Sequence, residues 1–241
     1  AHKVASAGLV FARKLMDGRH YKVLVEDARA SDYDLVVMGG LGMGAVKDSL
    51  LGSVTERFIR HVTTDTLVVR SRDSLPEGGG RIVACLDGSP RSFDGLGRAL
   101  ALSRALGRPV QAIAVYDSYL RFATFDGLSE VPSDRAFMIR RHRSHLEAGR
   151  ALAAREGIDL PTRLLEGKCF QVILAFAREE KPWLLIMGRT GTDADDEEAG
   201  LGSTTGALVR LARCNVLVTG GKPSPAEASP VPGGAPGNRG G

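Results

Sequence analysis

A pattern of glycines that occurs twice constrains the fold of this chain more than any other feature. Each copy reads Gly-x-x-Gly, then nine or ten residues, then Gly-Ser, and lies between a short apolar run and a segment of helical periodicity. The first copy consists of Gly39, Gly42, Gly52 and Ser53, and the second consists of Gly188, Gly191, Gly202 and Ser203. The chain is therefore a tandem repeat whose repeated element is a strand, a glycine-rich loop and a helix.

Glycines at the carboxyl end of a parallel strand remove side chains, so the backbone can approach a ligand closely. The helix that follows presents N–H groups without intrahelical partners, and these groups attract an anion. The serine hydroxyl donates to a phosphate oxygen or, without a ligand, caps the helix. The two loops therefore indicate phosphate binding, and we call them the first cradle (residues 39–53) and the second cradle (residues 188–203).

The sequence after residue 80 alternates strands with helices. Strands are expected at 81–87, 109–116, 161–165, 183–187 and 215–219, and helices at 92–106, 137–156, 170–180 and 204–212. The strand segments are continuously apolar, which indicates that helices cover both faces of the sheet. This pattern predicts an α/β fold with a parallel, doubly wound sheet.

The sequence before residue 71 contains only the later part of the same order. We expect a helix at 3–16, a strand at 21–25, a short helical piece at 28–33, a strand at 35–38, a helix at 53–62 and a strand at 66–70. The first strand, first helix and second strand have no counterpart. In the strand order that such folds use, the missing strands lie in the middle of the sheet, so the remaining strands could not pair normally. We therefore expect an N-terminal truncation of a longer protein, with a rearranged half-domain as the alternative.

Together these patterns predict four regions. Residues 1–70 form an incomplete domain, residues 71–80 form a linker rich in Gly, Ser, Asp and Pro, and residues 81–220 form a complete domain. Residues 221–241 are almost all Gly, Pro, Ala and Ser, and are expected to be a disordered tail.

Composition sets further limits. No apolar stretch approaches the length of a membrane span, and the N-terminus lacks the regions of a signal peptide. The three cysteines, Cys85, Cys169 and Cys214, lie far apart and form no C-x-x-C pair, which suits a reducing compartment and small buried side chains. We therefore expect a cytoplasmic protein. A formal net charge of +4 does not by itself argue for a nucleic-acid partner.

The chain resembles the universal stress protein family in a tandem arrangement. The resemblance covers nearly everything up to residue 220, and it rests on the first cradle, the Asp-Gly-Ser turn at 87–89 and the terminal strands at 67–69 and 216–218. It implies two units with strand order 3-2-1-4-5, the first incomplete, and pairing of the two units or of two chains through the last strands. It also implies a stress-response role with ATP or another adenine nucleotide as ligand.

The resemblance further implies roles for individual residues. Asp87 contacts the nucleoside, and the backbone of Val115 meets the base. The residues that hold the ribose and the phosphates are Gly188, Gly191, Gly202, Ser203 and Thr204. In the first unit only the phosphate loop has a counterpart, which consists of Gly39, Gly42, Gly52, Ser53 and Val54. The complete nucleotide site is therefore expected in the second unit.

Two features of the second unit leave alternatives open. The second cradle is one residue longer than the first and is acidic, and its carboxylates are Asp193, Asp195, Asp196, Glu197 and Glu198. They form either a solvated loop tip, which we favour, or a site where a divalent cation such as Mg²⁺ joins the nucleotide. Asp87 is either a ligand contact, which we favour, or only a turn-forming residue.

The segment 135–150 is rich in arginine and contains His142 and His145 three positions apart. A solvated helix face or an interface is favoured over nucleic-acid binding, because no aromatic side chains are interleaved with the arginines. Metal binding by the histidine pair lacks an evident third ligand nearby. Asp17, before Gly18, indicates a turn.

Neither cradle ends in the Gly-Lys-Ser/Thr sequence that clamps phosphates in many nucleotide-hydrolysing enzymes, which favours binding without efficient turnover. We therefore predict a stress-response protein that binds ATP or a related adenine nucleotide as a regulatory ligand. The alternatives are a scaffold with empty cradles, acting through dimerisation and partner binding, and a slow ATPase.

Overall fold

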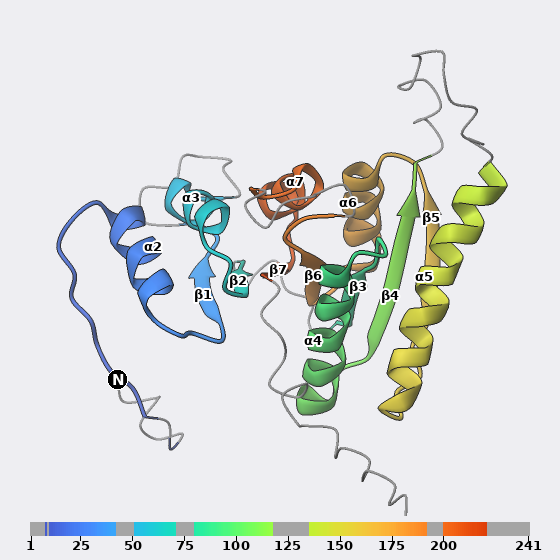
Figure 1. The fold of residues 1–241 in the computed structure, drawn as a ribbon, viewed down its shortest axis with the longest axis horizontal. Coiled ribbons are helices and arrows are strands. Elements are labelled where there is room, and N and C mark those ends of the chain that lie inside the picture. The colour runs from blue at the N-terminus through green and yellow to red at the C-terminus, as the bar shows by residue number, and fades with distance from the viewer. Residues whose placement is uncertain are drawn as a thin grey trace, which may run out of the picture.

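The computed structural model describes residues 8, 10–41, 51–70, 80–117, 135–191 and 200–220, and seven strands within this part form one sheet. The strands are β1 (Val36–Gly39), β2 (Thr66–Val69), β3 (Ile82–Cys85), β4 (Val110–Tyr116), β5 (Thr162–Glu166), β6 (Leu184–Gly188) and β7 (Asn215–Thr219). Their order is β1-β2-β7-β6-β3-β4-β5 (Figure 1). Neighbouring strands are parallel except β2 and β7, which are antiparallel. We call the described residues up to 70 the N-terminal half and those from 80 onward the C-terminal half.

The C-terminal half has the doubly wound α/β fold that its sequence predicts, and its strand order corresponds to 3-2-1-4-5. One face packs against α4 (Pro90–Leu106) and α5 (Arg135–Arg155), and the other against α6 (Cys169–Glu180) and α7 (Ser203–Leu211). β4 and β7 are buried at every position, which explains why their sequences are mostly apolar, and Gln111, Asn215 and Thr219 are their buried polar residues. None of the described helices combines the length and the apolar character needed to cross a membrane.

The turn between β3 and α4 shows how local sequence starts and ends a helix. Ser89 is the N-cap residue of α4, and its hydroxyl oxygen accepts a hydrogen bond from Ser92 N at 3.2 Å. Pro90 occupies the first turn, where no intrahelical N–H bond is lost. The helix ends at Gly107, whose φ of 62° lies in the left-handed region that glycine favours. These signals make α4 begin directly after the Asp-Gly-Ser turn.

The N-terminal half repeats the end of the C-terminal half. Its order of α2 (His20–Ala30), β1, α3 (Ser53–His61) and β2 matches that of α6, β6, α7 and β7. A glycine with similar backbone geometry precedes the first helix of each set, with φ of 129° at Gly18 and 127° at Gly167. A Cβ at either glycine would lie 2.9 Å from a methyl group of the valine five residues later. The repeat is therefore longer than the glycine pattern alone predicts.

Three expectations for the N-terminal half are wrong. The predicted strand at 21–25 lies inside α2, and the helical piece expected at 28–33 is only the end of that helix. Residues 10–16 of the predicted helix at 3–16 have no regular structure, and Val10 and Leu15 are fully exposed, while residues 3–7 and 9 lie outside the described part. A short apolar run such as that at 23–25 fits a helix or a strand equally well, so periodicity could not decide between them.

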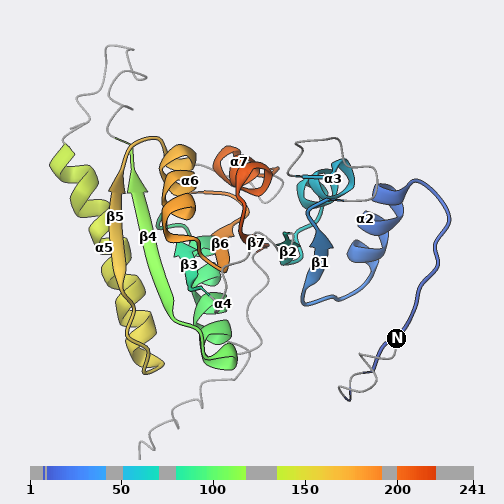
Figure 2. The ribbon, with the colours of Figure 1, turned by 180° about the vertical axis from the view of Figure 1, so that it is seen from behind.

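The expectation that the missing strands would prevent normal pairing is also wrong. β1 pairs with β2, and β2 pairs with β7. In the observed order, counterparts of β3, β4 and β5 would lie beyond β1, so their absence from the described residues leaves β1 at the edge of the sheet (Figure 2). Val37 on β1 is 57% exposed, whereas its counterpart Ile186 on β6 is buried against α4. One face of β1 is therefore open.

Two buried arginines extend across the seam between β2 and β7. Arg189, which follows β6, donates to three carbonyl groups at the C-terminal end of α3, and these belong to Ile59, Arg60 and Val62. Arg70, which follows β2, donates to Val209 O in α7. Burial lowers the pKa of both guanidinium groups. The last carbonyl groups of a helix lack intrahelical partners, so each arginine satisfies acceptors that the seam would otherwise bury unpaired.

Replacing Arg189 by methionine removes these donors while keeping a long side chain. We expect Arg189→Met to lower the free energy of unfolding by about 2 kcal/mol, because buried carbonyl groups lose their partners. Urea unfolding followed by circular dichroism measures this difference, with Arg213→Met at an exposed position as the matched control. Equal stability of the two variants would contradict the role assigned to Arg189.

Candidate functional site

The carboxyl ends of β3 and β6 meet in the middle of the C-terminal half. β3 pairs with β6 on one side and with β4 on the other, so the strand order changes direction at this point. Open parallel sheets bind ligands in the crevice outside the strand ends at such a switch point. The Asp-Gly-Ser turn follows β3 and the second cradle follows β6, so the fold brings these two motifs together.

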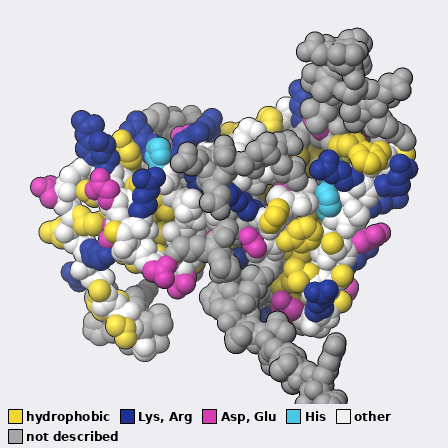
Figure 3. All heavy atoms as spheres, viewed as in Figure 1, with side chains coloured by type: hydrophobic (Ala, Val, Ile, Leu, Met, Phe, Trp, Pro, Cys, Tyr) yellow, Lys and Arg dark blue, Asp and Glu magenta, His cyan; other side chains and the backbone are white. Residues whose placement is uncertain are grey.

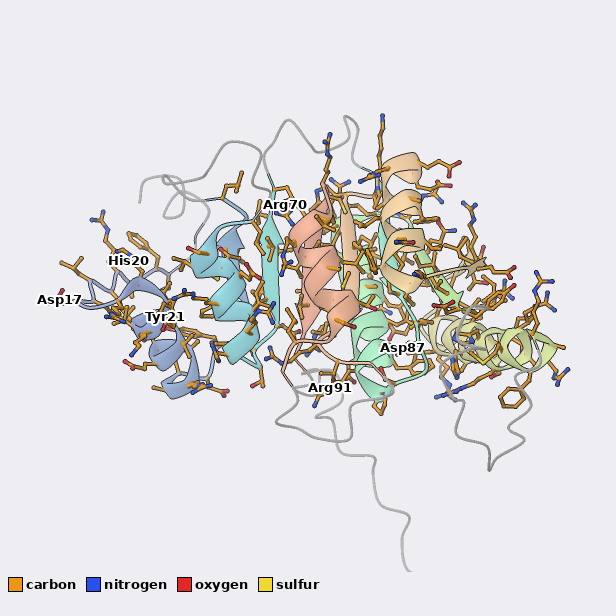
Figure 4. All side chains as sticks on the ribbon, turned by 90° about the horizontal axis from the view of Figure 1, so that it is seen from above. Asp17, His20, Tyr21, Arg70, Asp87 and Arg91 are labelled. Carbon is orange, nitrogen blue, oxygen red and sulfur yellow. The ribbon has the colours of Figure 1, made fainter. Side chains whose placement is uncertain are left out.

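Asp87 uses its two carboxylate oxygens differently. Oδ1 accepts hydrogen bonds from Ser89 N at 2.9 Å and from Ser89 Oγ at 2.6 Å, which holds the turn before α4. Oδ2 faces the second cradle, because a Cβ placed on Gly191 would lie 2.9 Å from it. Figure 4 labels Asp87 in the turn before α4 and Arg91 in the first turn of that helix. Asp87 is therefore a turn residue that also leaves one oxygen directed at the cradle.

Hydrogen bonds hold both ends of the second cradle. Gly202 N donates to Arg189 O at 2.9 Å, and Thr205 Oγ1 donates to Gly188 O at 2.8 Å. Space is tight, because a Cβ on Gly202 would lie 3.2 Å from Arg189 O, and a Cβ on Gly188 would lie 3.2 Å from Thr190 O. The N-cap residue of α7 is Gly202, which has no side chain to bond the first N–H groups of the helix. An anion can therefore bind there.

Ser203 is exposed and Thr204 is partly exposed at the start of α7, beside these N–H groups. The acidic residues at 193–198 lie outside the described residues, as does Gly42 of the first cradle. Within the described part, no group of three or more His, Cys, Asp and Glu side chains could hold a metal ion. The hydroxyl and N–H groups of α7 are thus the polar groups that the described part of this loop offers to a ligand.

Val115 lies near the carboxyl end of β4 and is only 7% exposed. Leu86 N donates to Ile113 O at 2.8 Å, which places the residue after Leu86, Asp87, beside the end of β4. Cys169 Sγ lies 4.0 Å from Val115 O and acts as a weak donor to it. Burial raises the pKa of the Cys169 thiol, and all three cysteines of the chain are free. Val115 thus lies at the end of β4, beside the strand end that carries Asp87.

The described ends of the first cradle have the same hydrogen bonds as those of the second. Gly52 N donates to Gly40 O at 2.6 Å, Thr55 Oγ1 donates to Gly39 O at 2.9 Å, and α3 begins at Ser53, followed by Val54. However, β1 is an edge strand, and the described residues beside it include no counterpart of β3, β4 or Asp87. The structure therefore brings the acid, the second-strand residue and a phosphate loop together only at the second cradle.

Sequence reasoning missed the pair formed by Arg91 and Thr190. Arg91 Nη1 donates to Thr190 Oγ1 at 2.9 Å. Arg91 Cβ lies 3.2 Å from the position of a Cβ on Gly188, so the arginine packs directly against the second cradle. An arginine in the first turn after the Asp-Gly-Ser motif was visible in the sequence, but its partner on another strand end was not.

His145 of α5 was expected on a solvated helix face or at an interface, with metal binding as the less favoured alternative, and the structure gives it a more specific place. Gly88 has a φ of 91°, and a Cβ there would lie 2.3 Å from His145 Cε1, so the imidazole ring packs on the turn that carries Asp87. The ring of His142 lies beside it, with a centroid distance of 5.6 Å. Burial lowers the pKa of His145, and the positive charges of His142 and Arg141 lower it further. His145 therefore supports the turn from the side of α5.

The other charged residues that the sequence analysis singled out lie away from Asp87 and the second cradle. Figure 3 shows Lys and Arg side chains interspersed with acidic and apolar ones over the face of the molecule that includes α5. The exposed arginines of that helix include Arg140, Arg141, Arg143 and Arg150, which fits a solvated helix face. Asp17 is exposed and lies at the end of the molecule formed by the N-terminal half, far from Asp87 (Figure 4).

Comparison with known proteins gives sequence relatives for both halves. The pattern of the universal stress protein family matches residues 3–70 and 80–220. A universal stress protein of Methanocaldococcus jannaschii is 28% identical over 152 residues, which is 63% of this chain and 86% of that protein. A universal stress protein of Mycobacterium tuberculosis is 34% identical over 90 residues, which is 36% of this chain and 30% of that protein. The match to the mycobacterial relative thus spans less than a third of its length.

Solved structures show the same fold. A universal stress protein from Archaeoglobus fulgidus superposes with a TM-score of 0.66 at 20% identity, covering 91% of this chain and 74% of its own. A protein from Pseudomonas aeruginosa assigned to the same family has a TM-score of 0.64 at 16% identity, covering 90% of this chain and 74% of its own. These likenesses concern the fold, whereas the sequence pattern matches most of the chain. The chain therefore belongs to the universal stress protein family.

Proposed function

We propose that this chain is a stress-response protein that binds ATP or a related adenine nucleotide at the second cradle. One observation carries the proposal. Asp87 Oδ2 faces Gly191, so the acid and the phosphate loop that the family resemblance assigns to one ligand lie side by side. The site at the strand ends of a doubly wound sheet supports the same conclusion.

Each part of the site suits one part of such a ligand. The start of α7, with Gly202, Ser203 and Thr204, offers N–H and hydroxyl donors to phosphate oxygens. Asp87 offers a carboxylate oxygen to the hydroxyl groups of a ribose. The buried strand end at Val115 offers backbone groups and apolar surface to a base.

The nucleotide acts in this proposal as a regulatory ligand and not as a substrate. Neither cradle ends in the lysine that contacts the phosphates in P-loop enzymes, so efficient phosphoryl transfer lacks one of its usual cations. The carboxylates at 193–198 are the groups that would bind Mg²⁺ beside the nucleotide, and they lie outside the described residues.

We also propose that residues 1–70 form an incomplete domain of the family and residues 81–220 the nucleotide-binding domain. The internal repeat supports this division, as does the pairing of β2 with β7, which makes the two last strands an intramolecular pseudo-dimer. A homodimer through those strands would need the strand edges of β2 and β7, which here form hydrogen bonds with each other. Residues 71–79 of the proposed linker and the tail at 221–241 lie outside the described residues. The free cysteines support a cytoplasmic location, because a reducing compartment keeps thiols free.

A scaffold with empty cradles is the second candidate function. The observation that favours it is apolar surface on and beside the edge strand, where Val37 is 57% and Leu35 is 47% exposed. Apolar patches of this kind are typical of interaction surfaces. Adenine nucleotide that co-purifies with the protein would argue against the scaffold.

Gly202→Val places a branched side chain where Arg189 O lies only 3.2 Å from the new Cβ. We expect the variant to lose ATP binding, because the side chain occupies the space in the second cradle. Isothermal titration calorimetry with and without Mg²⁺ measures this loss, and Gly97→Val is the control because a Cβ there meets nothing within 4 Å. No detectable binding by the unaltered chain at millimolar ATP would contradict the proposed function.

Asp87→Asn keeps an oxygen that accepts from Ser89 while removing the charge directed at Gly191. We expect its ATP affinity to fall about tenfold, because a charge-assisted hydrogen bond is lost, with little change in unfolding temperature. Asp87→Ala removes the turn contacts as well, so it lowers both affinity and unfolding temperature. If Asp87→Asn bound ATP as tightly as the unaltered chain, the carboxylate would serve only the turn.

A further inference from the structure

Arg91 is held at the point where α4 meets the second cradle. Its Nη1 donates to Thr190 Oγ1 at 2.9 Å, and its carbonyl oxygen accepts from Thr219 Oγ1 at 3.2 Å. The second contact ties the backbone of Arg91 to the end of β7, while the first directs the guanidinium group to the loop after β6. Arg91 is thus positioned by residues at two other strand ends, one turn of chain after Asp87 (Figure 4).

The N-terminal ends of two helices lie near the guanidinium group of Arg91. Arg91 lies in the first turn of α4, where the helix dipole disfavours a cation, and that turn contains no acidic residue. The N-terminal end of α7 opens from the same cradle and adds a second positive helix end. Arg189 is close enough for the positive charge of Arg91, together with burial, to lower its pKa.

Asp87, in the turn before α4, carries a carboxylate, but this carboxylate forms no ion pair with Arg91. Among the residues that the structure describes, none of the ion pairs within 4.0 Å includes Arg91. Arg98, two turns later on α4, instead pairs with Asp65 at 2.8 Å. The side-chain partner of Arg91 is the neutral hydroxyl of Thr190, which is itself only 6% exposed. A cation fixed by a neutral group beside two helix N-termini is the arrangement expected of an anion site.

We propose that Arg91 is a phosphate clamp, positioned by Thr190, that makes the second cradle prefer nucleoside di- and triphosphates to monophosphates. This inference rests on the proposed function, since it concerns the same site. A guanidinium group presents five N–H donors in a planar fork that fits phosphate oxygens, and one of them is directed to Thr190. Each further phosphate of the ligand adds negative charge near Arg91. The clamp therefore contributes more to the affinity for ATP and ADP than to the affinity for AMP or cyclic AMP.

The experiment titrates the full chain and its variants with ATP, ADP, AMP and cyclic AMP by calorimetry at two salt concentrations. We expect Arg91→Met to lower the affinity for ATP about tenfold and the affinity for AMP much less. The variant should also reduce the salt dependence of ATP binding. Arg91→Lys keeps the charge without the fork, so it retains an intermediate preference for ATP. Thr190→Val removes the positioning hydroxyl and lowers the ratio of ATP affinity to AMP affinity, but less than Arg91→Met does. Arg104→Met, at a 61% exposed side chain near the far end of α4, is the control.

The outcomes separate this inference from the proposed function. Suppose that the unaltered chain binds ATP. If Arg91→Met then lowers the affinities for ATP and AMP equally, or leaves the affinity for ATP unchanged or higher, the phosphate clamp is overturned while the nucleotide site stands. If the unaltered chain binds no nucleotide, the proposed function fails and the clamp fails with it. Circular dichroism confirms that each variant is folded, and Arg91→Lys still decides the preference if Arg91→Met is unstable.

Discussion

The antiparallel pairing of β2 with β7 joins the two halves into one sheet, and the position of both cradles depends on it. Each of these strands would otherwise present an edge of unpaired backbone groups. Asp65, just before β2, reinforces the seam from the N-terminal half. Its Oδ2 accepts from Arg98 Nε at 2.8 Å, and its Oδ1 accepts from Gly220 N at 2.9 Å, so α4 and the end of β7 are both fastened to it.

Each half contributes one buried arginine that binds a helix of the other half across the seam. α3 begins at the first cradle, and its last carbonyl groups bind Arg189, which follows Gly188 of the second cradle. α7 begins at the second cradle, and Val209 O binds Arg70, which lies over Gly40 of the first. A Cβ on Gly40 would lie 2.8 Å from Arg70 Nη1, so a side chain at this position would displace the guanidinium group of Arg70. The loop ends of both cradles are thus packed into the same seam.

Sequence patterns predicted the C-terminal half well because its signals are local. Continuously apolar strands and a glycine such as Gly107 at a helix end specify elements without reference to the rest of the chain. The prediction failed at 21–25, where packing of Val25 and Ala28 against Phe58 of α3 makes the segment a helix. At the site, Asp87 and the glycines were visible as motifs. The contacts of Arg91 with Thr190 and of His145 with Gly88 were not, because each joins segments that only the strand order brings together.

The central claim is that the two cradles differ in function because, among the described residues, only the second lies beside Asp87 and β4. Hydrogen exchange measured by mass spectrometry, with and without saturating ATP, tests this most directly, since bound ligand slows the opening of the amides that it contacts. The account predicts slower exchange at 86–89, 188–191 and 200–205, and unchanged exchange at 39–41 and 51–55. Slower exchange at the first cradle, with or without slower exchange at the second, or unchanged exchange at both would contradict it.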